Sequence, residues 1–347
     1  APANGGANVV GVTAGGAGAN VSLTATTNNL TLSQGVTATG DTVSLRTVAG
    51  NIVNTGGTVS AAYATLVAGG TTGAVGTSGA AVSVDAPNVA GSSGTGGFFL
   101  TDPNASGLTV GSITPAAGGT AVAGITSTGN VVLSATNGDL AVNNAVTATG
   151  STASLTSSTG AITDNGSGTV TSSNLWVSAG TNVGTTANAL LTNVSTLAGI
   201  SGTAGGGSPQ SIFVQESSPS QNLTIGSFNT PDGTSRSGLD ASLTGSTISV
   251  KMTGATQRGL VLGANVHAAD TVSLNDATTG GAITCTGGTV SATSLTLQAD
   301  GAIGTTAAPI LTNVGSLAGA TTSGSFIVSN SSSLNVTSVT PAVGGAD

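Results

Sequence analysis

The sequence predicts an all-β fold, a parallel β-solenoid and specifically a right-handed β-helix with about 20 to 24 residues per turn. Three observations lead to this fold class. A three-residue motif typical of a strand, called the strand word below, returns every 20 to 24 residues. Short turn-forming motifs, the turn words, separate its copies, and every copy runs in the same orientation. A hairpin protein would reverse the chain at tight turns, so stacked coils explain the pattern better.

The strand word places apolar residues on either side of a residue that is usually polar. This period of two is typical of a strand with one buried face and does not match the 3.6-residue period of a helix. In the first repeat the words stand at 21–23 (VSL), 43–45 (VSL), 64–66 (ATL) and near Val89. In the second they stand at 131–133 (VVL), 153–155 (ASL), 175–177 (LWV) and 195–197 (STL). In the third they stand at 248–250 (ISV), 272–274 (VSL), 295–297 (LTL) and 315–317 (GSL).

The turn words contain Gly, Asn and Asp, which accept the positive φ angles of tight turns. Examples are 56–58 (GGT), 137–139 (NGD), 149–151 (TGS) and 164–166 (DNG). At about 22 residues per turn and about 4.8 Å between neighbouring strands, the chain predicts roughly 16 turns and a rod about 75 Å long.

A longer repeat runs through the whole chain. A short motif in which Gly follows Pro within a few residues recurs at Pro2, Pro115, Pro231 and Pro341, and we call it the proline phrase. A longer segment, "VGTTANALLTNVSTLAG" at 183–199, returns as "IGTTAAPILTNVGSLAG" at 303–319. We therefore expect residues 1–347 to be a single continuous solenoid. Its repeats are 1–113, 114–229 and 230–339, and 340–347 begins a fourth. The segments 96–102, 211–217 and 325–330 lie where copy length varies most, so we expect loops or irregular coils there.

Composition excludes several classes of protein. The chain has 4 Lys and Arg residues in total, 12 Asp and Glu residues in total, and a net charge of -8. It therefore lacks the basic patch that binds the phosphate backbone of nucleic acid. Its mean hydropathy of +0.34 disfavours charge-driven disorder, and no apolar run is long enough for a transmembrane helix. Cys285 is the single cysteine, so no internal disulfide forms and we expect it to be buried as a small apolar residue.

The sequence predicts no catalytic, cofactor-binding or metal-binding residues and no cofactor. Glu216 is the only Glu, most Asp residues stand in turn words where they bond to backbone groups, and His267 with Asp270 lacks a nucleophile motif. The tandem Asp of calcium-binding nonapeptide repeats is absent. We expect the aromatic residues to pack in the core or at the ends rather than to stack on sugars: Tyr63, Phe98, Phe99, Trp176, Phe213 and Phe326.

The stretch "GNVVLSATNGDLAVNNAVTATGSTASLTSSTGAI" at 129–162, with the "IGTT…LTNV…LAG" block at 303–319, resembles the repeat region of filamentous-haemagglutinin-type bacterial exoproteins. The resemblance covers nearly the whole chain. It implies a β-helical shaft of a secreted adhesin at the bacterial surface. The Asn-Pro-Asn-Gly-type signature of the family's secretion domain is absent from this sequence, so the resemblance is to the shaft.

We therefore expect a structural, non-catalytic extracellular filament or adhesin shaft. Because the sequence begins and ends at the same phase of its long repeat, its partners are expected to be head-to-tail copies of itself or adjoining repeats of a longer chain. The alternative is a glycan-binding or glycan-cleaving β-helix, with cell-surface or matrix glycans as partners. A more distant alternative is an ice-binding solenoid, raised by the Thr-Ala-Thr words at 37–39 and 147–149.

Overall fold

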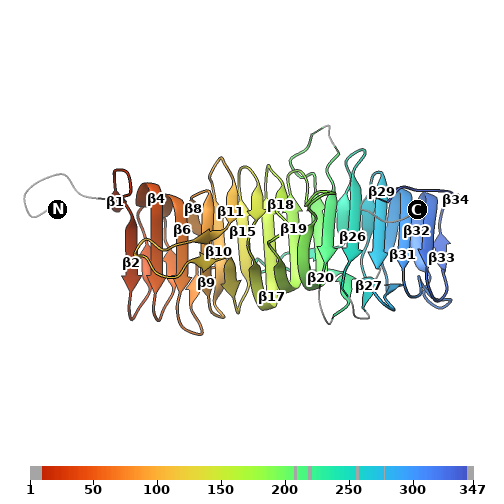
Figure 1. The fold of residues 1–347 in the computed structure, drawn as a ribbon, viewed down its shortest axis with the longest axis horizontal. Helices are drawn as coiled ribbons and strands as arrows, with labels where there is room; N and C mark the ends of the chain where they lie inside the picture. Colours follow the sequence, from red (N-terminus) through yellow and green to blue (C-terminus); the bar gives the residue numbers. More distant parts are fainter. Residues whose placement is uncertain (1–9, 207–208, 218–220, 255–257, 277, 342–347) are drawn as a thin grey trace, which may run out of the picture.

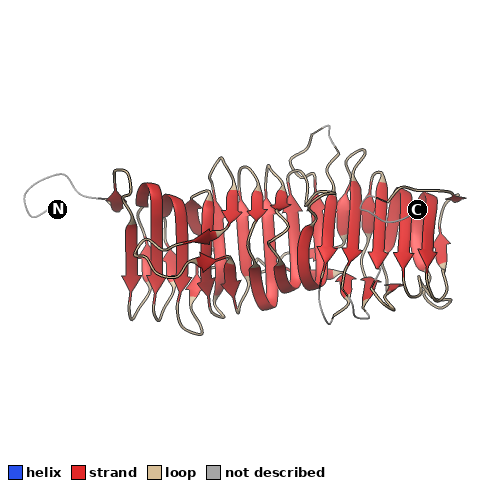
Figure 2. Ribbon diagram, in the orientation of Figure 1, coloured by secondary structure: helices blue, strands red, loops and turns tan. Residues whose placement is uncertain are grey.

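A computed structural model describes residues 10–206, 209–217, 221–254, 258–276 and 278–341 of the chain. These residues form a rod of stacked parallel strands, and the first and last described strands, β1 (Val12–Ala14) and β34 (Asn335–Val336), lie at opposite ends of the rod (Figures 1 and 2). The described part contains strands and loops but no helix. The solenoid has about 14 turns of about 23 residues, which confirms the predicted fold class. There are fewer turns than the 16 expected because hairpins and long loops use part of the chain.

The described strands follow one another along the chain. Strands β1 to β12 are Val12–Ala14, Val21–Ala25, Leu30–Leu32, Val36–Thr47, Ile52–Asn54, Thr58–Ala68, Ala74–Val75, Val82–Asp85, Asn88–Ser93, Gly97–Asp102, Leu108–Val110 and Ser112–Ile113. Strands β13 to β23 are Val122–Ala123, Ile125–Ser127, Val131–Ala135, Leu140–Val142, Val146–Ser157, Ile162–Asp164, Val170–Ala179, Leu190–Ser201, Ile212–Glu216, Leu223–Ile225 and Ser227–Asn229. Strands β24 to β34 are Ser235–Ser237, Leu239–Ala241, Thr247–Met252, Gly259–Leu262, Val266–Ala268, Thr271–Asp276, Ala282–Cys285, Thr289–Ala299, Ile310–Thr321, Val328–Asn330 and Asn335–Val336.

The predicted strand words stack on one another in register. Val21 pairs with Val43, Ser22 with Ser44, and the same parallel pairing continues into β6 and β9. The apolar residues of the words face a single hydrophobic core that runs along the rod. Each turn therefore buries its aliphatic side chains mainly against the turns above and below it, as in other solenoids.

Two ladders of parallel strands run the length of the described rod. Shorter parallel ladders complete the turns around the core, among them β1–β4–β6–β8, β14–β17–β19–β20 and β25–β28–β31–β32–β33. The first ladder passes through β2, β4, β6, β9, β11, β16 and β18, crosses the bridge at Val183, and continues through β21, β26, β29, β31, β32 and β34. The second ladder passes through β3, β5, β7, β10, β15, β17, β19, β20, β22, β27 and β30, and ends through the bridges from Ile283 to Ile303 and Phe326.

The long repeat alternates between these ladders. Strands β2, β15 and β26 carry the first word of the three repeats, but β2 and β26 lie in the first ladder and β15 lies in the second. Since three repeats share about 14 turns, each repeat advances by about four and a half turns. Equivalent elements of successive repeats therefore lie on alternate sides of the rod, a feature that linear spacing does not reveal. The division into the three repeats itself stays a prediction.

Glycine sets the geometry at two kinds of position. In β4 and β17 the pairing register shifts where Gly40 (φ 74°) and Gly150 (φ 67°) turn the strand from one side to the other. At Gly91 and Gly319 an added Cβ would lie 2.6 Å and 2.5 Å from the rings of Phe98 and Phe326. A side chain at either glycine would thus displace an aromatic ring at the core.

Two details of the sequence prediction are wrong. The words at 195–197 and 315–317 are displaced by two residues, because Leu197 pairs with Leu175 and Leu317 pairs with Leu295. A two-residue slip keeps the same side chains on the buried face, so the apolar pattern does not detect it.

The segments predicted as loops or irregular coils at 96–102, 211–217 and 325–330 instead contain strands β10, β21 and β33. Their alternating apolar side chains enter the core, and Phe98 is fully buried. The variation in length between repeats lies in the chain that flanks these strands.

The proline phrases leave the parallel ladders. Strands β12 and β13 pair antiparallel, as do β23 and β24, so the phrases at Pro115 and Pro231 belong to two short hairpins. We call residues 112–123 arm 1 and residues 227–237 arm 2. The phrase at Pro2 lies outside the described residues, as does the part of the predicted fourth repeat at 342–347.

Candidate functional site

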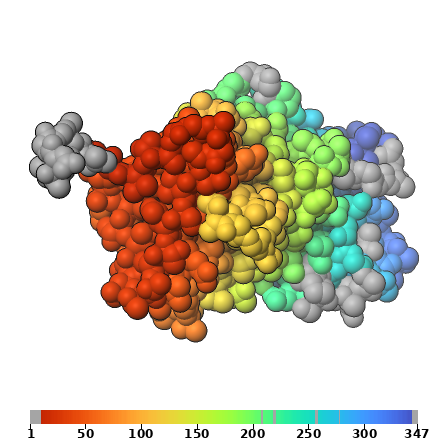
Figure 3. Space-filling view, turned by 60° about the vertical axis from the view of Figure 1, so that its left-hand side comes forward, coloured from red at the N-terminus to blue at the C-terminus, as the bar shows by residue number. Residues whose placement is uncertain are grey.

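Arm 1 folds back over the outer surface of the first repeat (Figure 1). The backbone N–H of Ala116 donates a hydrogen bond of 2.8 Å to Oγ of Ser44, and the Thr65 hydroxyl donates to the same oxygen at 2.8 Å. Ser44 and Thr65 are the middle residues of strand words and are buried. In Figure 3 the arm forms a gold patch that borders the red turns of the N-terminal end.

A cavity of about 380 Å³ separates part of arm 1 from the strands beneath it. Hydroxyl groups, the backbone of the arm and the exposed Arg46 side chain line this space. The cavities beside the equivalent phrases at Pro231 and Pro341 are smaller, at about 70 Å³ and 30 Å³. The first repeat therefore has the widest of these three spaces and the only one among them with a basic side chain.

Arm 2 lies over the second repeat. The guanidinium carbon of Arg236 lies 4.5 Å from the centroid of the Trp176 ring, and Trp176 is buried. Within the arm, the Thr230 hydroxyl donates to Asp232 at 2.6 Å and the Thr234 N–H donates at 3.0 Å. These hydrogen bonds lower the pKa of the Asp232 carboxyl below its usual value. A cation–π contact and a bonded turn thus hold the arm against its strands.

We predict that Arg236→Ala loosens arm 2. Loss of the cation–π contact should reduce the free energy of unfolding by about 1 kcal/mol. It should also increase acrylamide quenching of Trp176, which is the single tryptophan of the chain. Arg46→Ala is the matched control because Arg46 is exposed beneath the other arm. Equal quenching in wild type and the Arg236 variant would show that the arm does not cover Trp176 in solution.

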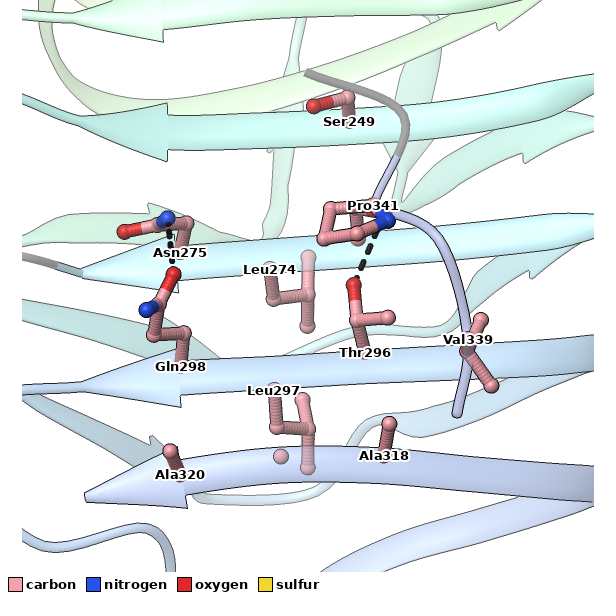
Figure 4. Close-up of a pocket in the computed structure, with 12 residues that line it drawn as sticks. Ser249, Leu274, Asn275, Thr296, Leu297, Gln298, Ala318, Ala320, Val339 and Pro341 are labelled. Carbon is pink, nitrogen blue, oxygen red and sulfur yellow. Dashed lines mark hydrogen bonds between the residues drawn. The ribbon is translucent and has the colours of Figure 1, made fainter. Parts of the chain in front are cut away.

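The phrase at Pro341 contacts the third repeat in the same way. Val339 and Pro341 lie over Thr296, Ala318 and Leu297, and Asn275 donates a 2.7 Å hydrogen bond to Gln298 at the rim (Figure 4). Since the long repeat alternates between ladders, arm 2 covers the second ladder, whereas arm 1 and this phrase cover the first. Each proline phrase therefore packs on the outer face of solenoid turns that precede it in the chain.

The two end turns of the described solenoid expose large apolar side chains. Val12 is 40 % exposed at one end, and Phe326 and Val336 are 37 % and 79 % exposed at the other. Residues 10–40 and 301–341 contain no charged residue. Soluble proteins protect exposed strand edges with charged side chains or Pro. These end turns present strand edges and apolar side chains without charges.

Three equivalent positions, 114 residues apart, carry Asp102, Glu216 and Asn330. Each side chain ends a strand at the edge of the core. Glu216 accepts a 2.7 Å hydrogen bond from the Thr192 hydroxyl and 3.2 Å bonds from the Val194 N–H. Asn330 Oδ1 accepts the corresponding bonds from Thr312 at 2.8 Å and Val314 at 3.0 Å.

In the first repeat this arrangement is incomplete. The pairing of β10 with β8, continued by one residue, places Val84 beside Asp102 where the other repeats have Thr. Asn104 donates its backbone N–H to Asp102 Oδ1 at 2.8 Å, but Oδ2 is buried without a hydrogen-bond partner. Burial, reinforced by the charge of Asp85, raises the pKa of Asp102 to about 7. Sequence reasoning missed this set because it assigned the Asp residues to turns. The 114-residue spacing was the available signal.

The other titratable groups are dispersed. Burial also raises the pKa values of Asp164 and Asp276. His267 Nδ1 lies 3.0 Å from Asp240 rather than near Asp270, because β25 and β28 place Asp240 and His267 in register. The sequence assigned His267 and Asp270 no role, and the carboxylate that contacts His267 is that of Asp240. Within the described residues, no group of three His, Cys, Asp or Glu side chains forms a candidate metal site.

The aromatic residues and the cysteine follow the sequence expectation in part. Phe98, Phe99, Trp176 and Phe213 are buried, whereas Tyr63 and Phe326 are 45 % and 37 % exposed. Cys285 is buried and lies 3.2 Å from the Gly288 carbonyl oxygen. The predicted role of the cysteine as a small buried residue is confirmed.

Together these features define a class of protein, an elongated parallel β-solenoid with proline arms on its sides and open strand edges at the described ends. No protein-family profile, curated protein or solved structure matches the chain significantly. Across the ranges that the structure describes, no helix is long and apolar enough to cross a membrane.

Proposed function

We propose that the chain is part of a structural, non-catalytic extracellular filament or adhesin shaft at the bacterial cell surface. The observation that carries this proposal is the single apolar core that runs through about 14 stacked turns. Such a fold gains length with every added turn and needs no separate domain. The resemblance of its repeat words to filamentous-haemagglutinin-type exoproteins supports the same role.

The composition and the arms suit a rod that works outside the cell. Backbone groups pair between turns along both ladders, which leaves few strands free for proteolysis. The proline arms bury Ser and Thr side chains that would otherwise form an outward ladder. We propose that extension comes from end-to-end stacking of copies or from further repeats in a longer chain.

A second candidate is a glycan-binding shaft, and the cavity beneath arm 1 favours it. This space of about 380 Å³ combines Arg46 with hydroxyl groups of Ser22 and Thr24, which suits a sugar that carries a carboxylate. The cavity gives less support to glycan cleavage, because this reaction uses a pair of Asp or Glu carboxylates and none is found among the described residues that line the cavity.

Imaging of native material separates these candidates. We expect electron microscopy to show rods longer than one chain, and an array of neutral and acidic glycans to show no binding. An intact mass near 32.2 kDa would assign extension to stacked copies, and a larger mass would assign it to further repeats. Isolated particles no longer than one chain would refute the filament. Acidic-glycan binding that disappears in Arg46→Ala would favour the second candidate.

A further inference from the structure

The internal junctions of the solenoid show how its two ends fit together. The C-terminal strands β33 and β34 occupy the repeat positions of β10 and β11, and the N-terminal strands β2 and β3 occupy those of β15 and β16. Within the chain, β10 pairs with β15 and β11 pairs with β16. The same junction recurs one repeat later, where β21 pairs with β26 and β22 pairs with β27. The ends are thus two halves of a junction that the chain already forms twice.

Burial at the C-terminal end supports this equivalence, whereas Val21 and Leu32 at the N-terminal end are already 5 % and 3 % exposed. Phe326, Leu334 and Val336 are 37 %, 39 % and 79 % exposed, whereas their counterparts in both internal junctions are at most 1 % exposed. These counterparts are Phe98, Leu108 and Val110 in the first junction, and Ile212, Leu223 and Ile225 in the second. Covering the end turn would bury the same apolar surface that stabilises the internal junctions.

Charge favours a second copy as the covering partner. The described end turns, 10–40 and 301–341, contain no charged residue, so contact between them desolvates no ion. They also lack the Lys residues that block pairing at natural sheet edges. The edges are parallel and expose complementary hydrogen-bonding groups, which another solenoid turn in the same orientation satisfies.

We infer that the C-terminal end of one chain binds the N-terminal end of a second copy in the register of the internal junctions. This inference rests on the proposed function. Phe326, Val328 and Asn330 then pair with Val21, Leu23 and Ala25 of the second copy, as Phe98, Leu100 and Asp102 pair with Val131, Leu133 and Ala135. Leu334 and Val336 pair with Leu30 and Leu32 of the second copy.

The register also fixes the rotation between copies. Strand β33 follows the bridge to Phe326 at the end of the second ladder, whereas β2 begins the first ladder. Pairing β2 on β33 therefore continues the second ladder of one chain with the first ladder of the next. Successive copies are related by about half a turn around the rod, so the proline arms keep alternating between its sides.

Disulfide trapping tests this register. In a Cys285→Ala background, a Thr24→Cys chain is mixed with a Ser329→Cys chain and oxidised. Both positions are exposed, and their predicted pairing copies that of Thr101 with Ser134. Paired residues on neighbouring strands lie about 4.8 Å apart, within the span of a disulfide. We expect a disulfide-linked dimer, with about tenfold less from a Ser22→Cys and Ser329→Cys mixture, whose two-residue offset exceeds that span.

Controls make each outcome decisive. A single chain with Thr101→Cys and Ser134→Cys should close an internal disulfide under the same conditions, which verifies folding and geometry. Closure of this control without the mixed dimer would overturn the inference, as would equal dimer from the offset pair or disulfide dimers of either single variant alone. If trapping fails while native material still shows long rods, the filament proposal survives with a different mode of extension. If trapping succeeds but native material shows no long rods, the inferred binding between the two ends is supported and the filament proposal is refuted.

Discussion

Phe98→Ala is expected to reduce the free energy of unfolding by about 3 to 5 kcal/mol, more than the same substitution of Phe326, the aromatic residue at the equivalent repeat position. Phe98 is the largest fully buried side chain of the described residues. Its ring approaches Gly91, where an added Cβ would lie 2.6 Å away. Truncation leaves a cavity that neighbouring strands cannot fill, because both ladders fix their backbones. Urea denaturation followed by circular dichroism measures the loss.

The repeat provides a matched control for this substitution. Phe326 occupies the same position at the C-terminal end and contacts Gly319 in the same way, but it is 37 % exposed. In isolated chains, Phe326→Ala should therefore cost about 1 kcal/mol, close to the average of point substitutions. Equal losses for the two variants in dilute, monomeric protein would contradict the assigned exposure of the end turn. A loss at Phe326 that grows with protein concentration would indicate stacking.

The sequence was sufficient to predict the fold class because every turn repeats the same physical solution. An apolar, polar, apolar word predicts a half-buried strand, and its return in one orientation predicts parallel stacking. The pairing of Val21 with Val43 and of Val131 with Ala153 follows these words directly. The period was a reliable guide because each strand word contacts its neighbours about one turn away in the sequence.

The candidate surfaces were harder to predict because they depend on contacts that skip several turns. Ala116 bonds to Ser44 from 72 residues away, and no local pattern marks either partner. The strand words also did not reveal that successive repeats lie on alternate ladders, since a residue count does not measure how far the chain has rotated. Register errors at Leu197 and Leu317 have the same origin, because period-two patterns tolerate a shift of two residues.

Asp102 makes the stability of the rod depend on pH, and this dependence is the second large effect we predict. Its pKa is about 7 in the folded chain, compared with about 3.9 for an unperturbed Asp. Between these values the folded state keeps a proton that the unfolded state releases. The free energy of unfolding therefore falls as the pH rises from about 4 to 7 and changes little above that range.

The expected size of the effect follows from the shift of the Asp102 pKa. One pKa unit corresponds to about 1.4 kcal/mol, so this single carboxyl destabilises the rod by up to about 4 kcal/mol between pH 4 and pH 8. The pKa values of Asp164 and Asp276 are also raised by burial, and they add a dependence of the same sign. Acidic conditions should thus stabilise this rod, the reverse of proteins that depend on paired, ionised carboxylates.

Asp102→Asn should remove most of this dependence and stabilise the protein at pH 8. The third repeat already carries the neutral Asn330 at the equivalent position. In the first repeat Val84 offers no hydroxyl like that of Thr312, but the Asn104 N–H that donates to Asp102 Oδ1 can also donate to an amide oxygen. Urea denaturation at pH 5 and pH 8 measures the change, with Asp270→Asn as a control at an exposed position. An unchanged slope in Asp102→Asn would mean that the buried carboxyl ionises in the folded rod without penalty, because water or a rearranged Asn104 reaches Oδ2.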